Sequence, residues 1–113
     1  MRLTWTHRPP PDFDPRKPVD AALIPYSGLW RLDDETGAEV ARVEKSQSRP
    51  YGSPWAGKIA RRLYPPGRLP TWVTRRGAQA ARRAIQDALV AECRQRLNCE
   101  PEELEFFTME VSK

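Results

Sequence analysis

The sequence predicts an α+β fold in which an antiparallel sheet of four to five strands carries one long amphipathic helix packed on one face. Three observations predict it: short segments that alternate apolar and polar residues, turn-forming residues between them, and one long run with apolar residues three and four positions apart. At 113 residues the chain has room for a single domain, residues 1–113. Its twelve prolines mean that much of the domain must be loop.

The first expected strand is the segment RLTWTH at residues 2–7. Leu3 and Trp5 lie on one side of it and threonines on the other, which is the two-residue period of a half-buried strand. A proline-rich segment follows at about residues 8–26, where neither a helix nor a central strand can persist. We expect a surface loop or an extended arm there.

A β-hairpin is the clearest local signal, in GLWRLDDETGAEVARVEKS at residues 28–46. Apolar and charged residues alternate in both arms, and the loop places Gly37 where a positive φ is wanted. The segment WAGKIARRL at residues 55–63 follows as the third strand of an antiparallel meander. Its alternation directs Trp55 towards the core and Lys58 outwards, so the outward face of this strand is expected to be basic.

The helix is expected after the break YPPGRLP, with Thr74 as its N-cap. Its apolar stripe consists of Ala78, Ala81, Ile85, Ala88, Leu89, Cys93 and Leu97. This stripe is expected to pack on the meander. Asn98 can close the helix in a left-handed conformation, and Pro101 prevents its continuation. The last segment, LEFFTMEV at residues 104–111, predicts a final strand, and PEEL before it is compatible with a short helical turn.

The sequence offers little for catalysis or for metal binding. The two cysteines lack CxxC spacing, no glycine-rich phosphate loop is present, and the single histidine, His7, is expected at the surface or a sheet edge. Asp33, Asp34 and Glu35 fall in the hairpin loop, where Asp favours turn geometry. We therefore expect a binding protein and not an enzyme, with no cofactor and no metal. No apolar run approaches the roughly twenty residues of a membrane span, so a cytoplasmic location is expected.

A basic tract is the strongest functional signal. Residues 58–83 contain eight Lys or Arg residues and no Asp or Glu, which indicates either a solvated face or a surface for phosphates or an acidic partner. The predicted contact residues are Lys58, Arg62, Arg68, Trp72, Arg75 and Arg76. Trp72 has two interpretations: a hydrophobic staple against the first helical turns, or an aromatic contact beside the arginines. Arg82 and Arg83 are expected to complete a wet face of the helix.

The order of the hairpin, WAGKIARRL and TRRGAQAARRAIQDAL resembles the three-strand-plus-helix plan of phage integrase arm-binding and related small DNA-binding domains, over roughly residues 28–92. In those families the sheet enters the major groove. More loosely, the Arg- and Trp-rich chain is similar to the small accessory proteins of bacteriophages, a group that includes anti-CRISPR and other inhibitors. The chain departs from the DNA-binding plan by an additional strand and proline-rich arm before the hairpin and an acidic strand after the helix.

Two functional hypotheses follow from the resemblance and the charge pattern. In the leading one, the chain is a phage-type accessory protein that binds and modulates a host protein, or protein–nucleic acid complex, of nucleic-acid processing or defence. In the alternative, the basic tract binds DNA or RNA directly. No membrane partner is expected. The acidic C-terminal end also permits a homodimer, in which that end of one chain meets the basic tract of another.

Overall fold

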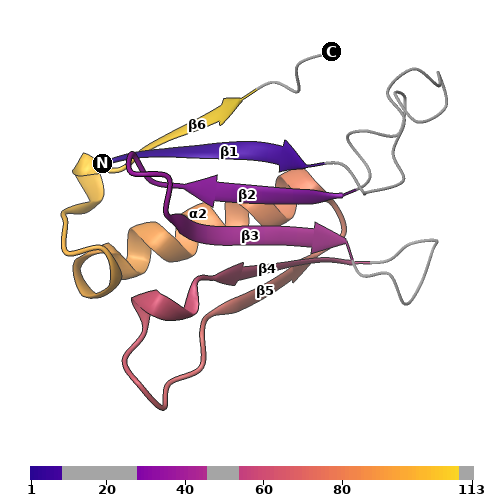
Figure 1. Ribbon diagram of the computed structural model, residues 1–113. Coiled ribbons are helices and arrows are strands. Elements are labelled where there is room, and N and C mark those ends of the chain that lie inside the picture. Colours follow the sequence, from indigo (N-terminus) through magenta and orange to yellow (C-terminus); the bar gives the residue numbers. More distant parts are fainter. Residues whose placement is uncertain (9–27, 46–53, 110–113) are drawn as a thin grey trace, which may run out of the picture.

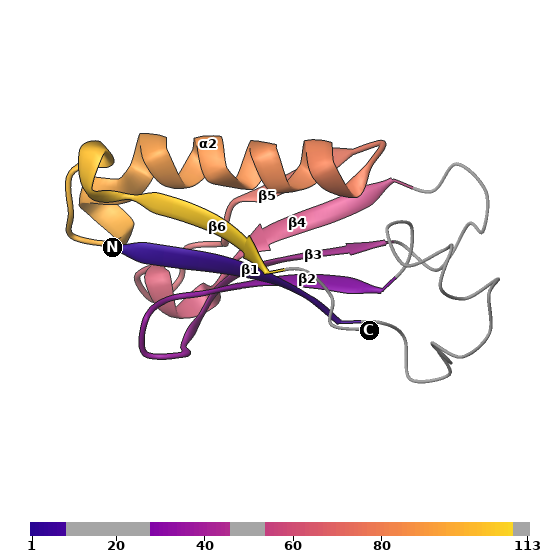
Figure 2. The same cartoon turned by 90° about the horizontal axis from the view of Figure 1, so that it is seen from above.

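The computed structural model describes residues 1–8, 28–45 and 54–109, and its fold is α+β, which confirms the predicted class (Figure 1). The strands form one six-stranded sheet in the order β5-β4-β3-β2-β1-β6. Their bounds are β1 (Arg2–Arg8), β2 (Leu29–Asp33), β3 (Glu39–Lys45), β4 (Trp55–Ile59), β5 (Trp72–Arg75) and β6 (Glu105–Met109). The helix α2 (Ala78–Arg96) lies along one face of the sheet (Figure 2), and two 3₁₀ turns, η2 (Arg61–Leu63) and η3 (Pro101–Glu103), connect the elements.

The core lies between the sheet and α2, where the alternation of the sequence places it. The sheet contributes the buried side chains of Leu3, Trp5, Trp30, Leu32, Ala41, Val43, Trp55 and Ile59. The helix contributes Ala78, Ala81, Ile85, Leu89 and Cys93, while Ala88 and Leu97 are partly buried. The predicted stripe and the predicted core positions of Trp30 and Trp55 are therefore confirmed.

β6 runs parallel to β1, whereas all the other neighbouring strands in the sheet are antiparallel. Leu3 pairs with Phe106, and the backbone N–H of Glu105 donates a hydrogen bond to the carbonyl oxygen of Met1 at 2.9 Å. The parallel direction arises because α2 returns the chain to the end of the sheet where β1 begins (Figure 1). The sequence predicted this final strand but could not predict its direction.

The segment that was assigned to the helix N-terminus is a strand. β5 pairs antiparallel with β4, and α2 begins only after its N-cap Gly77, so Thr74 lies in a strand and is not the cap. Trp, Val and Thr favour strands, and the outer edge of β4 supplies their hydrogen-bond partners. The predicted third strand is in turn too long, since β4 ends at Ile59 and η2 follows.

Several local predictions are confirmed. Gly37 has φ +86° in the hairpin loop, and Asn98 has φ 53° after the helix. Pro101 opens η3, the short turn predicted before the last strand. The proline-rich arm lies outside the described residues apart from Arg8, as do residues 110 and 111 of the last predicted strand. Among the described helices, none has the length and apolarity required to cross a membrane.

Candidate binding face

A row of paired side chains crosses the face of the sheet opposite α2. Arg31 of β2 pairs with Arg42 of β3, Arg42 pairs with Lys58 of β4, and Lys58 pairs with Trp72 of β5. Neighbouring strands lie about 4.8 Å apart, so these four side chains form one continuous line. We call this line the basic row. The row arises because the residues directly before and after each member along its own strand point into the core, so the member itself points to the opposite face.

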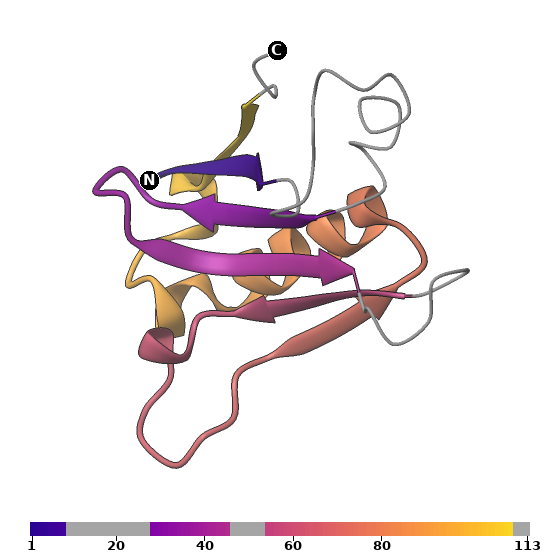
Figure 3. The same cartoon turned by 45° about the vertical axis from the view of Figure 1, so that its right-hand side comes forward.

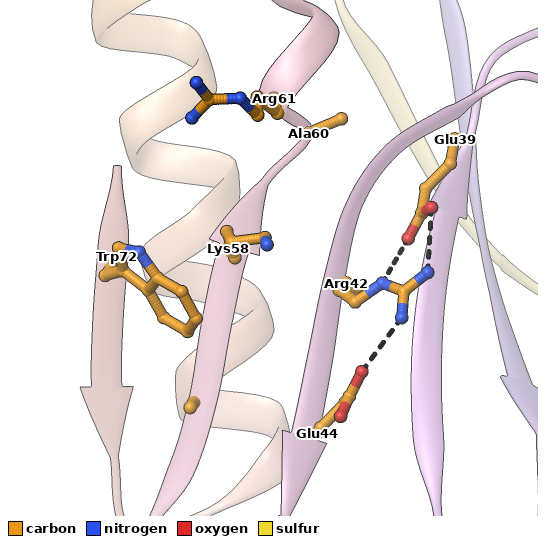
Figure 4. Close-up of a pocket in the computed structure, with 8 residues that line it drawn as sticks. Glu39, Arg42, Glu44, Lys58, Ala60, Arg61 and Trp72 are labelled. Atoms are coloured by element: carbon orange, nitrogen blue, oxygen red, sulfur yellow. Dashed lines mark hydrogen bonds and ion pairs between the residues drawn. The ribbon is translucent and has the colours of Figure 1, made fainter. Parts of the chain in front are cut away.

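Arg42 at the centre of the basic row is already neutralised. Its guanidinium donates two hydrogen bonds to the carboxylate of Glu39, at 2.5 and 2.9 Å, and a third to Glu44 at 3.1 Å (Figure 4). The hydrogen bonds from Arg42 hold the pKa of Glu39 below its ordinary value against the opposing effect of burial. The same bonds raise the pKa of Arg42. Arg31 is engaged as well, with its Nε 2.6 Å from Asp33.

Lys58 and Arg61 are different, because neither forms an ion pair with a described carboxylate. Both line a groove of about 500 Å³ on the open face, together with Trp72 and the Arg42 cluster (Figure 4). The ammonium of Lys58 lies 5.2 Å from the ring centroid of Trp72, within the range of a cation–π contact. The indole of Trp72 is 61% exposed. The most distinctive feature of this groove is an exposed aromatic ring in contact with Lys58, with a second cation, Arg61, lining the same groove.

The loop before β5 holds Trp72 in place. The hydroxyl of Tyr64 donates to Thr71 Oγ1 at 2.5 Å and accepts from the Thr71 backbone N–H at 3.0 Å. Thr71 Oγ1 in turn donates to a carboxylate oxygen of Glu92 on α2 at 3.1 Å. The residue immediately before Trp72 is therefore tied to the helix on the other side of the sheet. Trp72 is an open-face residue and not a staple against the first helical turns, since its strand directs it away from α2.

The predicted contact residues do not form one patch. Lys58 and Trp72 are brought together, but Arg62 on η2 is tied to the β2–β3 hairpin, with its Nε 3.0 Å from the carbonyl oxygen of Glu39 and its Nη2 3.6 Å from Asp34. Arg68 lies exposed in the loop that follows η2.

Arg75 and Arg76 lie at the opposite end of β5 from Trp72, where the chain turns into α2 (Figure 3). Arg75 pairs with Trp55, three residues and thus about 10 Å along the strand from the pair of Lys58 and Trp72. Both arginines precede the N-cap, so they are not part of the first helical turn as the sequence suggested.

The residues that could act in catalysis or bind a metal have structural roles in this fold. His7 is 6% exposed, and its ring packs 4.8 Å from that of Trp30, so the expectation of a surface histidine is wrong. Asp34 accepts hydrogen bonds from the Thr36 hydroxyl and from the backbone N–H groups of Thr36 and Ala38, as a turn-forming Asp does, and these bonds lower its pKa. Within the described segments, no three His, Cys, Asp or Glu residues are grouped as metal ligands. Both cysteines are free.

The groove also contains Glu39, Arg42 and Arg61, which were not among the predicted contact residues. Strand parity could have found Arg42, because it alternates with the core residues of its strand. Arg61 could not have been found, because it was assigned to a strand that in fact ends before it. Comparison with family models, curated proteins and solved structures found no match to this chain.

Proposed function

We propose that this chain is a non-enzymatic binding protein whose open sheet face binds an acidic segment of a partner protein. The observation that carries the proposal is the groove lined by Lys58, Arg61 and the exposed indole of Trp72, with Lys58 in contact with the ring. Exposed tryptophans and arginines are the side chains that most often dominate protein interfaces. The two unpaired cations favour carboxylates on the partner, and the ring offers apolar area beside them.

The charge distribution favours a protein partner over a nucleic acid. Two of the three cations of the basic row already have carboxylate partners, so the face offers few charges for consecutive phosphates. One or two carboxylates of a peptide need only the two cations of this groove that have no described carboxylate partner, whereas consecutive phosphates need a longer row of cations. The remaining cations of the basic tract lie on different sides of the molecule. The setting that agrees with the resemblance is a phage-type accessory protein that binds a host protein in the cytoplasm.

The test is binding to an array of acidic, neutral and basic peptides that each contain or lack an aromatic residue. We expect the wild-type protein to bind acidic peptides, and a Lys58→Ala/Trp72→Ala variant to lose at least about tenfold in affinity. The matched control is Val90→Ala/Arg94→Ala, which also removes one cation and one exposed apolar side chain, but from α2. Equal binding of the two variants to acidic peptides would overturn the proposal.

A second measurement addresses the nucleic-acid alternative. Labelled duplex DNA, single-stranded DNA and RNA are titrated with the wild type and with an Arg75→Glu/Arg76→Glu variant at low and near-physiological salt. We expect weak binding that does not distinguish the three. Tight, salt-sensitive binding that collapses in the variant would replace the proposed protein partner with a nucleic acid, because phosphate contacts release counterions.

A further inference from the structure

Arg82 on α2 was expected on a wet helix face, but it is partly buried against the sheet. Its guanidinium carbon lies 3.9 Å from the ring centroid of Trp30, a stacked arrangement that fixes the plane of the guanidinium. The Nε atom of Arg82 is buried and has no hydrogen-bond acceptor among the described residues. Burial without a counter-charge lowers the pKa of Arg82. A cation in this position is held in place by the protein and is free of a carboxylate partner among the described residues.

The surroundings of Arg82 form an open groove of about 740 Å³ beside α2, at the edge of the sheet where β6 lies. The groove is lined by Gln79, Arg82, Arg83, Gln86, Asp87 and Thr108. Of the three guanidinium nitrogens of Arg82, only Nε is both buried and without a hydrogen bond, so the two terminal nitrogens reach solvent. These nitrogens are the pair of donors that binds a carboxylate with two parallel hydrogen bonds.

A second donor is oriented by the core. The indole Nε1 of Trp5 donates a hydrogen bond to Gln86 Oε1 at 3.1 Å. Because an indole N–H can only donate, it must meet the oxygen of the amide, and the amide NH₂ of Gln86 is left as a donor on the other side. Gln86 is thus held in one orientation by a side chain that is itself fully buried. The groove therefore combines a stacked guanidinium with an amide donor that packing holds in place.

From this geometry we infer a second binding site, in which Arg82 and Gln86 bind a carboxylate group of a small organic acid or of an acidic side chain. A carboxylate fits better than a phosphate for two reasons. It is planar like the guanidinium and takes both hydrogen bonds in one plane. It also carries a single negative charge, whereas a phosphate dianion would be repelled more strongly by Asp87 in the same groove. This site is separate from the open face, since α2 and the basic row lie on opposite sides of the sheet.

The experiment follows backbone amide shifts by NMR while sodium acetate, a monocarboxylate, is added to the wild-type protein. A parallel titration with sodium chloride at equal ionic strength corrects for screening. We expect saturable shifts confined to residues 79–87 and 108, with an apparent dissociation constant of about a millimolar, as a few solvent-facing charge-assisted hydrogen bonds supply. Shifts identical to those in chloride, or shifts centred elsewhere, would overturn the inference without any variant having to fold.

Two variants identify the residue responsible. Arg82→Lys keeps the charge but loses the planar pair of donors, and we expect binding to weaken about fivefold or more. Arg94→Lys makes the same change at an exposed arginine of α2 that does not line this groove, and it is expected to bind as the wild type does. Equal weakening in both variants, or in neither, would contradict a site built on Arg82. Thermal denaturation of each variant shows whether it is folded.

The source of the carboxylate is resolved by a third arm in the Lys58→Ala/Trp72→Ala background, which removes the open-face groove. Acetate and a short oligoglutamate peptide are compared at equal carboxylate concentration. Tighter binding of the peptide at residues 79–87 assigns the site to acidic side chains, and equal binding assigns it to small organic acids. Loss of all shifts in this background would show that the carboxylates had bound at the open face and would overturn the second site.

Discussion

At the scale of single residues, the cations of this chain differ more by their partners than by their type. Arg42 is bound by two carboxylates, and Lys58 has an aromatic ring as its neighbour. Arg82 stacks on Trp30 and has no carboxylate partner in the described part of the chain. The count of eight positive charges between residues 58 and 83 therefore overstates the charge available to any one partner. What a partner meets is the small subset without carboxylates of their own.

The pair of Glu39 and Arg42 gives a prediction on pH dependence. Because the folded-state pKa of Glu39 is depressed, its contribution to stability is present above the ordinary carboxyl value and is lost as the pH falls through the lower folded value. We expect Glu39→Gln to cost about 0.5–1 kcal/mol at pH 7, discounted for its partial exposure, and much less near pH 3. Urea denaturation at both values measures this difference.

The control for Glu39 is Glu102→Gln, which changes an exposed carboxylate of η3 in the same way. It is expected to leave stability at both pH values within about 0.5 kcal/mol of the wild type. A cost for Glu39→Gln that is unchanged between pH 7 and pH 3 would contradict the ion-pair explanation, because packing alone does not titrate.

At the scale of elements, the close approach of α2 to β4 depends on a residue with no side chain. A Cβ added to Gly57 would lie 2.8 Å from Ile85 Cγ1 and 2.8 Å from Val73 Cγ2. Gly57 is therefore a point where the helix, β4 and β5 approach one another closely. This explains why a glycine can stand in the middle of a strand, where it otherwise weakens the sheet.

Gly57→Ala is predicted to destabilise the fold by about 1–3 kcal/mol, because Ile85 and Val73 must both move to admit a methyl group. Gly77→Ala provides the comparison, since a Cβ there meets nothing within 4 Å and its φ of −158° is open to any residue. We expect it to cost less than about 1 kcal/mol. Urea denaturation of both proteins decides the point, and a Gly57→Ala variant as stable as the wild type would contradict the tight packing.

At the scale of the whole molecule, the parallel pair of β1 and β6 joins the two ends of the described chain. The two adjacent phenylalanines of β6 lie on opposite faces of the sheet. Phe106 packs against the core, and Phe107 is 40% exposed on the open face. The guanidinium carbon of Arg2 lies 4.7 Å from the centroid of the Phe107 ring. Phe106 therefore contributes to the core, and Phe107 contributes to the exposed surface.

Phe106→Ala is predicted to cost about 2–4 kcal/mol, because it opens a cavity at the junction of the first and last strands. Phe107→Ala is predicted to cost about 1 kcal/mol or less, which corresponds to a surface cation–π contact and partial burial. Denaturation by urea compares them, and equal costs would mean that the two faces of β6 are not distinguished as described.

The sheet order also bears on self-association. The acidic η3 and β6 lie at one edge of the sheet, and Arg75 and Arg76 lie by the other edge at β5. Contact between these regions of two chains would be heterologous, and such a contact propagates unless its rotation closes a ring. The homodimer envisaged from sequence charge would instead make two such contacts, in which the acidic edge of each chain meets the basic edge of the other about a two-fold axis. Sedimentation over a range of protein concentrations would reveal which form of association, if either, occurs.

The sequence by itself determined the fold class, the inward faces of β1 to β4, the apolar stripe of the helix and the left-handed residue that ends it. These features are local, because side-chain direction alternates along a strand and recurs every three or four residues along a helix. Part of the candidate site could also be predicted, because the alternation that buries Trp55 directs Lys58 to the opposite face of the sheet.

Only the tertiary structure decided that Trp72 lies on a strand beside Lys58, that β6 runs parallel to β1, and that Arg82 stacks on Trp30. Each of these depends on partners far away in the sequence. The segment at residues 72–75 is compatible with a helix start in isolation, and it becomes a strand because the edge of β4 supplies hydrogen-bond partners. Whether an arginine can bind a partner depends on whether the fold brings a carboxylate next to it.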